Sequence, residues 1–70
     1  MKKNYLKILE KAKNMTAKEF TDYLDKKDIP WIWDECDNIS DYNEGRCVID
    51  VIECGFNVWF EKGRFVEIYK

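Results

Sequence analysis

The sequence predicts an α+β domain in which two N-terminal helices pack on one face of a three- to four-stranded antiparallel meander sheet. Three observations carry this prediction. Residues 46–69 contain three alternating apolar runs, two glycine-containing turns separate those runs, and two amphipathic segments precede them. A chain of 70 residues has room for one core. We therefore expect a single domain over 1–70 with the order α-α-β-β-β-β.

The first helix is predicted over about residues 2–13. Tyr5, Ile8, Leu9 and Ala12 follow the i, i+3, i+4, i+7 spacing that places side chains on one helix face, with Leu6 beside them. Lysines take the other face. A helix this short is marginal in water by itself, so its apolar face must dock on the sheet.

The second helix is predicted over about residues 17–27. Thr16 and Glu19 have the spacing of a capping box, in which each side chain accepts a hydrogen bond from the backbone amide of the other residue. The apolar stripe of this helix is Ala17, Phe20, Tyr23 and Leu24. Pro30 ends the helical part, because the residue before a proline is pushed out of the α region.

Four strands are predicted at about 31–36, 46–53, 56–61 and 64–69. Residues 37–45 have the composition of a loop. If that loop is a long hairpin connection, the first strand pairs antiparallel with the second. A proline at the head of the first strand suits a strand at the edge of a sheet.

The register follows if Cys54-Gly55 and Lys62-Gly63 are both two-residue turns. The predicted cross-strand pairs are then Glu53–Phe56, Val51–Val58, Ile49–Phe60, Phe60–Phe65 and Phe56–Tyr69. The core face would hold Cys47, Ile49, Val51, Glu53, Phe56, Val58, Phe60, Phe65, Glu67 and Tyr69. The opposite face would hold Val48, Asp50, Ile52, Asn57, Trp59, Glu61, Arg64, Val66 and Ile68. A slip of one residue would exchange the two faces.

The predicted opposite face is more apolar than a solvated sheet face should be, because it keeps Trp59 among aliphatic residues. Two explanations are open. Trp59 is covered by a loop, or by Trp31 or Trp33 folding back. Alternatively, it is the apolar centre of a contact patch with a polar rim, which is the usual anatomy of a protein interface.

Charge is unevenly distributed along the chain, although the net charge is only −2. Residues 1–27 contain eight lysines and four acidic residues, residues 28–45 contain six acidic residues and no basic one, and residues 46–70 contain four of each. The sequence thus predicts a basic helical end and an acidic loop.

Catalytic patterns are not recognised in the sequence. It has no histidine, and its single serine, Ser40, has no base near it in the chain. Asp34 with Glu35 and Asp37 with Asp41 offer paired carboxylates, but the spacing after Asp37 does not match a calcium-binding loop. Solvated carboxylates are the preferred interpretation, so we expect no enzymatic activity, no cofactor and no metal.

The three cysteines, Cys36, Cys47 and Cys54, form no CxxC pair and are odd in number. This argues against a disulfide framework and favours small buried thiols in a reducing compartment. The N-terminal lysines are not followed by the apolar stretch of a signal peptide. No apolar run approaches the roughly 18 residues that span a bilayer. We therefore expect a cytosolic protein without membrane association.

The leading functional hypothesis is a small inhibitor or accessory protein that binds another protein. Its expected anchors and steering charges are Trp31, Trp33, Trp59, Asp34, Glu35, Asp37, Asp41 and Glu44. The expected partner is basic, such as a nucleic-acid-handling protein. Self-association through the free sheet face or an edge strand is compatible with this hypothesis. The size, acidity and lysine-rich codon usage are typical of proteins from phages, mobile elements and toxin immunity systems.

The alternative hypothesis is a nucleic-acid-binding or regulatory protein that uses the lysine-rich first helix. Six lysines lie within residues 2–18. An isoelectric point of about 5.1 and only two arginines argue against direct nucleic-acid binding.

Overall fold

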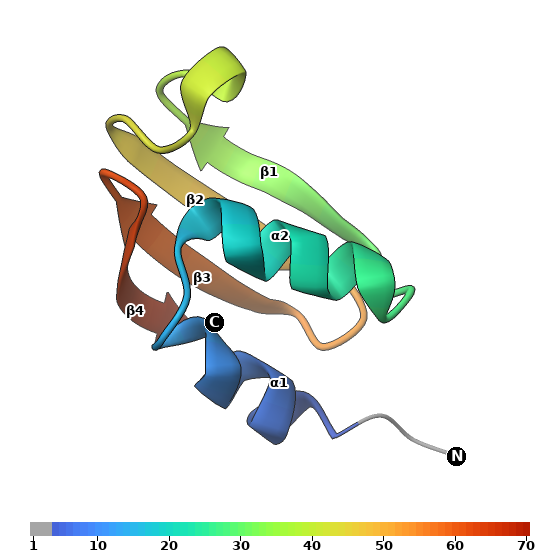
Figure 1. Ribbon diagram of the computed structural model, residues 1–70. Coiled ribbons are helices and arrows are strands. Elements are labelled where there is room, and N and C mark those ends of the chain that lie inside the picture. The colour runs from blue at the N-terminus through green and yellow to red at the C-terminus, as the bar shows by residue number, and fades with distance from the viewer. Residues whose placement is uncertain (1–3) are drawn as a thin grey trace.

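A computed structural model describes residues 4–70 of the chain, and in it two helices precede a single four-stranded antiparallel sheet (Figure 1). The elements are α1 Tyr5–Ala12, α2 Ala17–Lys26, β1 Trp31–Cys36, the short 3-10 helix η1 Ile39–Asp41, β2 Arg46–Val51, β3 Phe56–Glu61 and β4 Arg64–Tyr69. The strand order in the sheet is β1-β2-β3-β4. The predicted α+β fold, its element order and the antiparallel pairing of the first two strands are confirmed.

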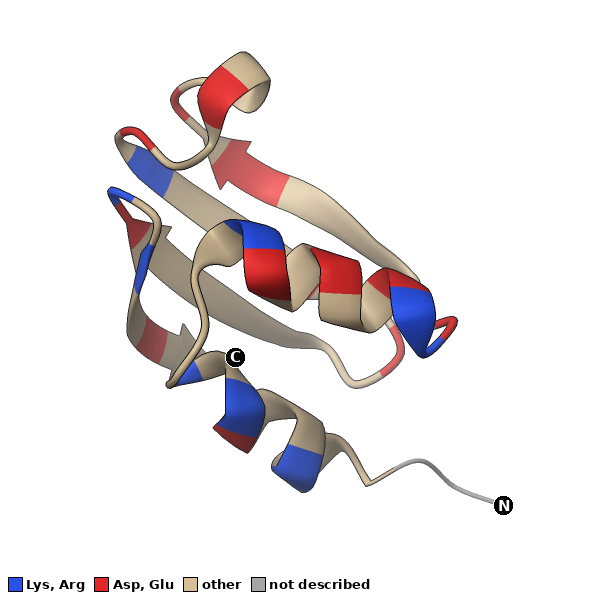
Figure 2. Cartoon of the chain, viewed as in Figure 1, with Lys and Arg blue, Asp and Glu red and all other residues tan. Residues whose placement is uncertain are grey.

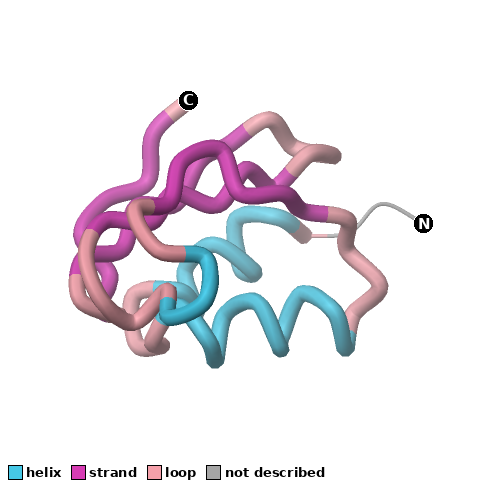
Figure 3. The backbone as a smooth tube through the Cα atoms, turned by 90° about the horizontal axis from the view of Figure 1, so that it is seen from above, coloured by secondary structure: helices cyan, strands magenta, loops and turns pink. Residues whose placement is uncertain are grey.

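The molecule has two layers, a sheet and a pair of helices (Figure 3). Both helices lie on the same side of the sheet, so its other face has no helix against it. Among residues 4–70, neither helix is long and apolar enough to cross a membrane.

Helix α1 begins at Tyr5, because the Asn4 side chain caps it by accepting a hydrogen bond from the backbone amide of Lys7 at 3.1 Å. Residues 2 and 3 of the predicted span lie outside the described residues. Ile8 and Leu9 are buried as expected. Leu6 is 76% exposed and contributes nothing to the core, because it lies off the docking face.

A side-chain hydrogen bond ties the start of α1 to the loop between β2 and β3. The Tyr5 hydroxyl donates to the Glu53 carboxylate. This bond holds the phenol in its neutral form and raises the pKa of Tyr5 from 10.0 to about 12.

Helix α2 is bounded by local hydrogen bonds at both ends. The predicted capping box forms, since the Glu19 amide donates to Thr16 Oγ1 at 3.2 Å and the Thr16 amide donates to Glu19 Oε1 at 2.9 Å. At the C-terminus, Asp28 has a positive φ of 57°, and the Ile29 amide donates to the Leu24 carbonyl at 2.9 Å. This is a Schellman-type ending, which turns the chain towards β1.

The core lies between the helices and the sheet. Its buried members are Ile8, Leu9, Ala12, Ala17, Phe20, Leu24, Ile29, Ile49, Val51, Val58 and Phe60. Phe60 is central, with its ring centroid 5.8 Å from that of Phe20 and 6.2 Å from that of Phe65. The predicted core face is therefore correct for β2 and β3.

The turn between β2 and β3 differs from the prediction. Val51, not Glu53, pairs with Phe56, so four residues, 52–55, make the connection and β2 ends at Val51. The amide of Gly55 donates to the Val51 carbonyl at 3.0 Å, and Gly55 takes the positive φ that closes the loop. The pairing shifts by two residues, and a shift of two leaves every side chain on its predicted face.

The turn between β3 and β4 has the predicted two residues, and both Lys62 and Gly63 adopt the positive φ of a type I′ turn. Phe60 pairs with Phe65 as predicted. Further along β4 the register shifts, so that Trp59 pairs with Glu67 across an extra residue. This is the geometry of a β-bulge.

The bulge reverses the faces at the end of β4. Ile68 pairs with Val58 and packs against the core, whereas Tyr69 pairs with Asn57 on the opposite face. The predicted positions of Ile68, Glu67 and Tyr69 are therefore wrong. Strict alternation of side chains does not hold across an inserted residue.

The cysteine prediction is also corrected. Cys36 and Cys47 lie directly opposite each other on β1 and β2, with Cα atoms 4.0 Å apart, and form a disulfide. Cys54 is a free cysteine. The separation of 11 residues gives no local motif, because only the register of the two strands brings these side chains together.

Candidate functional site

The face of the sheet away from the helices, here called the free face, is built from three rows of paired side chains. The rows are Ile32–Asp50–Asn57–Tyr69, Glu35–Val48–Trp59–Glu67 and Arg46–Glu61–Arg64. The middle row places an apolar pair, Val48 and Trp59, between two carboxylates. The free face therefore has an apolar centre and charged surroundings.

Trp59 occupies the centre of the free face. It lies opposite Val48, which is completely buried although no helix covers it. The guanidinium carbon of Arg46 lies 4.9 Å from the centroid of the Trp59 ring, which is the geometry of a cation–π contact. Neither a loop nor Trp31 or Trp33 folding back is needed to account for the environment of Trp59, since Arg46 lies over it.

Arg46 is held in turn by Glu35, whose Oε1 lies 3.2 Å from Arg46 Nη1. Both side chains are about half exposed, so the ion pair contributes at most about 1 kcal/mol. Arg46 Nε and Trp59 Nε1 are buried and have no hydrogen-bond partner among the described residues. A buried donor without an acceptor typically costs about 1–3 kcal/mol, so this stack is not arranged for maximum stability.

Trp31 and Trp33 lie on the other side of the sheet. Both are half-buried at the margin of the core. Trp31 Nε1 donates to Asp25 Oδ1 of α2 at 2.8 Å, and its ring meets that of Trp33 edge to face at 5.1 Å. The Trp33 ring also lies 5.0 Å from that of Tyr42. The three tryptophans predicted as anchors thus do not share one surface, and Trp59 alone belongs to the free face.

The predicted acidic residues divide into two groups. Asp37 accepts a hydrogen bond from the Arg46 amide at 2.9 Å, Asp41 accepts one from the Asn43 amide at 3.3 Å, and Glu35 pairs with Arg46. The side chains of Asp34 and Glu44 are exposed, and within residues 4–70 neither side chain makes a hydrogen bond or an ion pair. The first group shapes the loop, and the second is available to another molecule.

The loop carrying these charges is fixed at its base. Gly45 has φ +79°, and a Cβ there would lie 3.0 Å from Asp37 Oδ2. The Lys62 amide donates to the Gly45 carbonyl at 2.8 Å, which joins the loop to the β3–β4 turn. The acidic residues therefore project from a defined scaffold.

The loop between β1 and β2 and helix α1 differ in charge and lie at opposite ends of the molecule (Figure 2). Acidic residues gather at the end of β1 and along the loop to β2, whereas α1 displays mainly lysines at the opposite end. Within residues 4–70, no group of three or more Cys, Asp or Glu side chains could hold a metal ion.

Of the eleven residues in the three rows of the free face, only Glu35 and Trp59 were among the predicted site residues. Three of the other nine show why. Ile32 is 52% exposed, and alternation in β1 already separates it from Trp31 and Trp33. Arg46 carries no sequence signal for its position over Trp59, since the two are 13 residues apart. Tyr69 reaches this face only through the bulge in β4.

The chain matches no protein-family model, no curated protein and no solved structure at a significant level.

Proposed function

We propose that this chain is a non-catalytic protein-interaction module whose free face binds a basic surface of another protein. The observation that carries the proposal is the apolar centre of that face, where Trp59 lies opposite a fully buried Val48 and no helix packs on this side of the sheet. Tryptophan is enriched among the residues that dominate binding energy. An apolar centre surrounded by charged groups is the usual anatomy of a protein interface.

Contact through the face is favoured over contact through an edge. Both edge strands, β1 and β4, contain a register shift, between Trp33 and Glu35 in one and opposite Trp59 and Phe60 in the other. Bulges at sheet edges disrupt the row of free backbone groups that a further strand would need. The exposed carboxylate of Asp34 lies at the β1 shift and adds to this protection.

The charge of the free face and its loop favours a basic partner. Acidic side chains outnumber arginines on this face, on β1 and in the loop that follows it. The arginines are Arg46 and Arg64, and the carboxylates belong to Asp34, Glu35, Asp37, Asp41, Glu44, Asp50, Glu61 and Glu67. Such an excess steers association with a positively charged surface and raises the association rate more than the affinity. A protein surface that itself binds nucleic acid has this chemistry.

Within this proposal the chain acts as an inhibitor or accessory protein, like the small acidic proteins of phages, mobile elements and toxin immunity systems. Its size supports that role, because a few hot-spot residues on a rigid sheet are sufficient for a specific interface.

Affinity capture from a bacterial lysate tests the proposal when four immobilised forms are compared. These are wild type, Trp59→Ala, Asp34→Lys with Glu44→Lys, and Lys26→Ala as a matched surface control. We expect one basic protein to be retained by wild type and by the control and lost with Trp59→Ala. The double charge reversal should slow its association.

If folded Trp59→Ala retains the same protein as strongly as wild type does, the free face is not the binding surface. The free face could instead bind a second copy of this chain. Light scattering of the purified protein tests this, because it measures the molar mass in solution. A wild-type dimer that becomes a monomer in Trp59→Ala would show that the free face mediates self-association and does not bind a basic partner.

A further inference from the structure

A cavity of about 430 Å³ lies between α1 and α2, on the opposite layer of the molecule from the free face. Its walls carry three lysines, Lys7 and Lys11 from α1 and Lys27 from the end of α2. Its floor is apolar, because Ile8 and Ile29 are almost fully buried. Cavities of this size accommodate small organic ligands.

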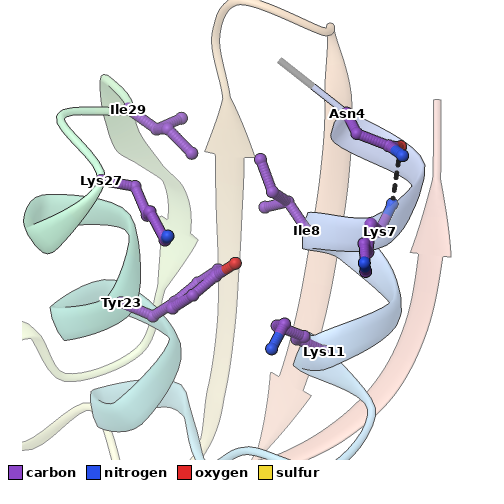
Figure 4. A pocket seen from close by; sticks show the side chains of 7 residues that line it. All are labelled: Asn4, Lys7, Ile8, Lys11, Tyr23, Lys27 and Ile29. Carbon is purple, nitrogen blue, oxygen red and sulfur yellow. Dashed lines mark hydrogen bonds between the residues drawn. The ribbon is translucent and has the colours of Figure 1, made fainter.

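Figure 4 shows how Lys11 and Lys27 lie beside Tyr23, while Lys7 lies next to Asn4 on α1. Tyr23 reaches from α2 into the space between the helices, with Lys27 on its own side and Lys11 facing it from α1. The Nζ atoms of Lys11 and Lys27 lie 5.8 and 5.9 Å from the centroid of the Tyr23 ring. Two ammonium groups from different helices are thus gathered at one aromatic side chain.

The lining of this cavity holds positive charges without acidic ones. Among residues 4–70, no Asp or Glu side chain lines it. Elsewhere on the helices, Lys13 pairs with Glu10 at 3.6 Å and Lys18 pairs with Asp22 at 3.2 Å. The three lysines of the cavity make no such ion pair within residues 4–70, so three positive charges face a hollow with an apolar floor.

We propose that this cavity binds the phosphate group of an organic phosphate ester. A phosphate monoester carries a charge of about −1.5 to −2 at pH 7, which matches converging ammonium groups, and lysine binds phosphate as a point charge. Ile8, Ile29 and the Tyr23 ring offer an apolar surface for the body of the ligand. The Tyr23 hydroxyl and Asn4, which caps α1 at the end of the cavity, add polar groups.

The site is independent of the proposed protein interface, because its residues belong to the helix layer. Its occupant is a phosphate ester, and two sources have that chemistry, a free nucleotide and the backbone of a nucleic acid. The hollow lies between two helices, and its volume of about 430 Å³ is that of a small ligand, which favours the free nucleotide.

Titration of isotopically labelled protein with adenosine 5′-monophosphate, followed by amide chemical shifts, tests the proposal. We expect saturable shifts at Lys7, Lys11, Tyr23, Lys27 and Ile29. Adenosine at the same concentration should give none of them. The dissociation constant should rise with added salt, because the attraction is electrostatic.

Variants supply the controls. Lys11→Gln and Lys27→Gln should each weaken nucleotide binding about 10-fold, the loss expected for one charge-assisted contact. Lys18→Gln is the matched control on α2, and it should bind as wild type does. All three side chains are exposed, so the fold is expected to tolerate the changes.

Three results would overturn the proposal. The first is an absence of saturable shifts with the nucleotide. The second is equal binding of adenosine, which would leave the lysines without a role. The third is binding of a single-stranded oligonucleotide without terminal phosphates while the monophosphate does not bind. That outcome would make the cavity a contact for a nucleic-acid backbone.

Discussion

The bulge in β4 determines which residues belong to the free face, and two substitutions test it. With the bulge, Ile68 packs against the core beside Val58, and Tyr69 lies on the free face opposite Asn57. Regular alternation after the β3–β4 turn would give the reverse arrangement. The perturbation is therefore the same change at two neighbouring positions, Ile68→Asp and Tyr69→Asp.

The structure sets the expected magnitudes. Burial of an isoleucine side chain contributes about 1.5–3 kcal/mol, and half-buried Ile68 supplies roughly half of that. A carboxylate placed against the core adds a desolvation cost of about 1–3 kcal/mol. Ile68→Asp should thus cost about 3 kcal/mol. Tyr69→Asp should cost only about 1 kcal/mol, because half-buried Tyr69 loses a similar burial contribution but its carboxylate would face solvent and not the core. The whole chain is expected to be stable by only about 3.5–10 kcal/mol.

Urea unfolding followed by circular dichroism measures both variants. With a slope of about 1 kcal/mol per molar urea, the two midpoints should differ by about 2 M. If Ile68→Asp is already unfolded without urea while Tyr69→Asp is folded, the result also agrees with the bulge. Equal losses, or a larger loss for Tyr69→Asp, would refute the register and remove Tyr69 from the free face.

Three further predictions concern the helices and the cysteines. Thr16→Ala should lower the free energy of unfolding by about 1 kcal/mol in urea titrations, because it removes half of the capping box, and an unchanged midpoint would contradict that role. The raised pKa of Tyr5, about 12 against 10.0 for the ordinary phenol, means that its hydrogen bond stabilises the fold fully below about pH 10 and is lost as the pH rises towards 12. Wild type should therefore lose stability more steeply than Tyr5→Phe across that range, and parallel curves would show that the bond contributes nothing. Thiol titration of the denatured, unreduced protein should find one reactive group, Cys54, and three after reduction, whereas three thiols before reduction would exclude the Cys36–Cys47 bond.

The sequence was sufficient for the fold because its signals are local. Apolar spacing identifies both helices, Thr16 and Glu19 mark the start of α2, and Lys62-Gly63 fixes the second hairpin. Each of these features depends on residues within a few positions of one another. The division of β2 and β3 into a core face and a free face follows from the same alternation.

The remaining features depend on tertiary geometry. Residues 65–69 read as a strand with or without an insertion, since Val66 and Ile68 are both apolar, so no periodicity reveals the bulge. The Cys36–Cys47 pair and the position of Arg46 over Trp59 require the strand register. The lysine-lined cavity requires the mutual orientation of two helices, which the sequence does not specify.

The central claim is that Trp59 on the free face dominates binding of a basic protein partner. Its most direct test is the dissociation constant of the captured partner for wild type and for Trp59→Ala, with folding checked by circular dichroism. We predict a loss of about 2 kcal/mol, or about 30-fold in affinity, as expected for a hot-spot tryptophan. Equal affinities for two equally folded proteins would contradict the claim and move the interface to another surface of the molecule.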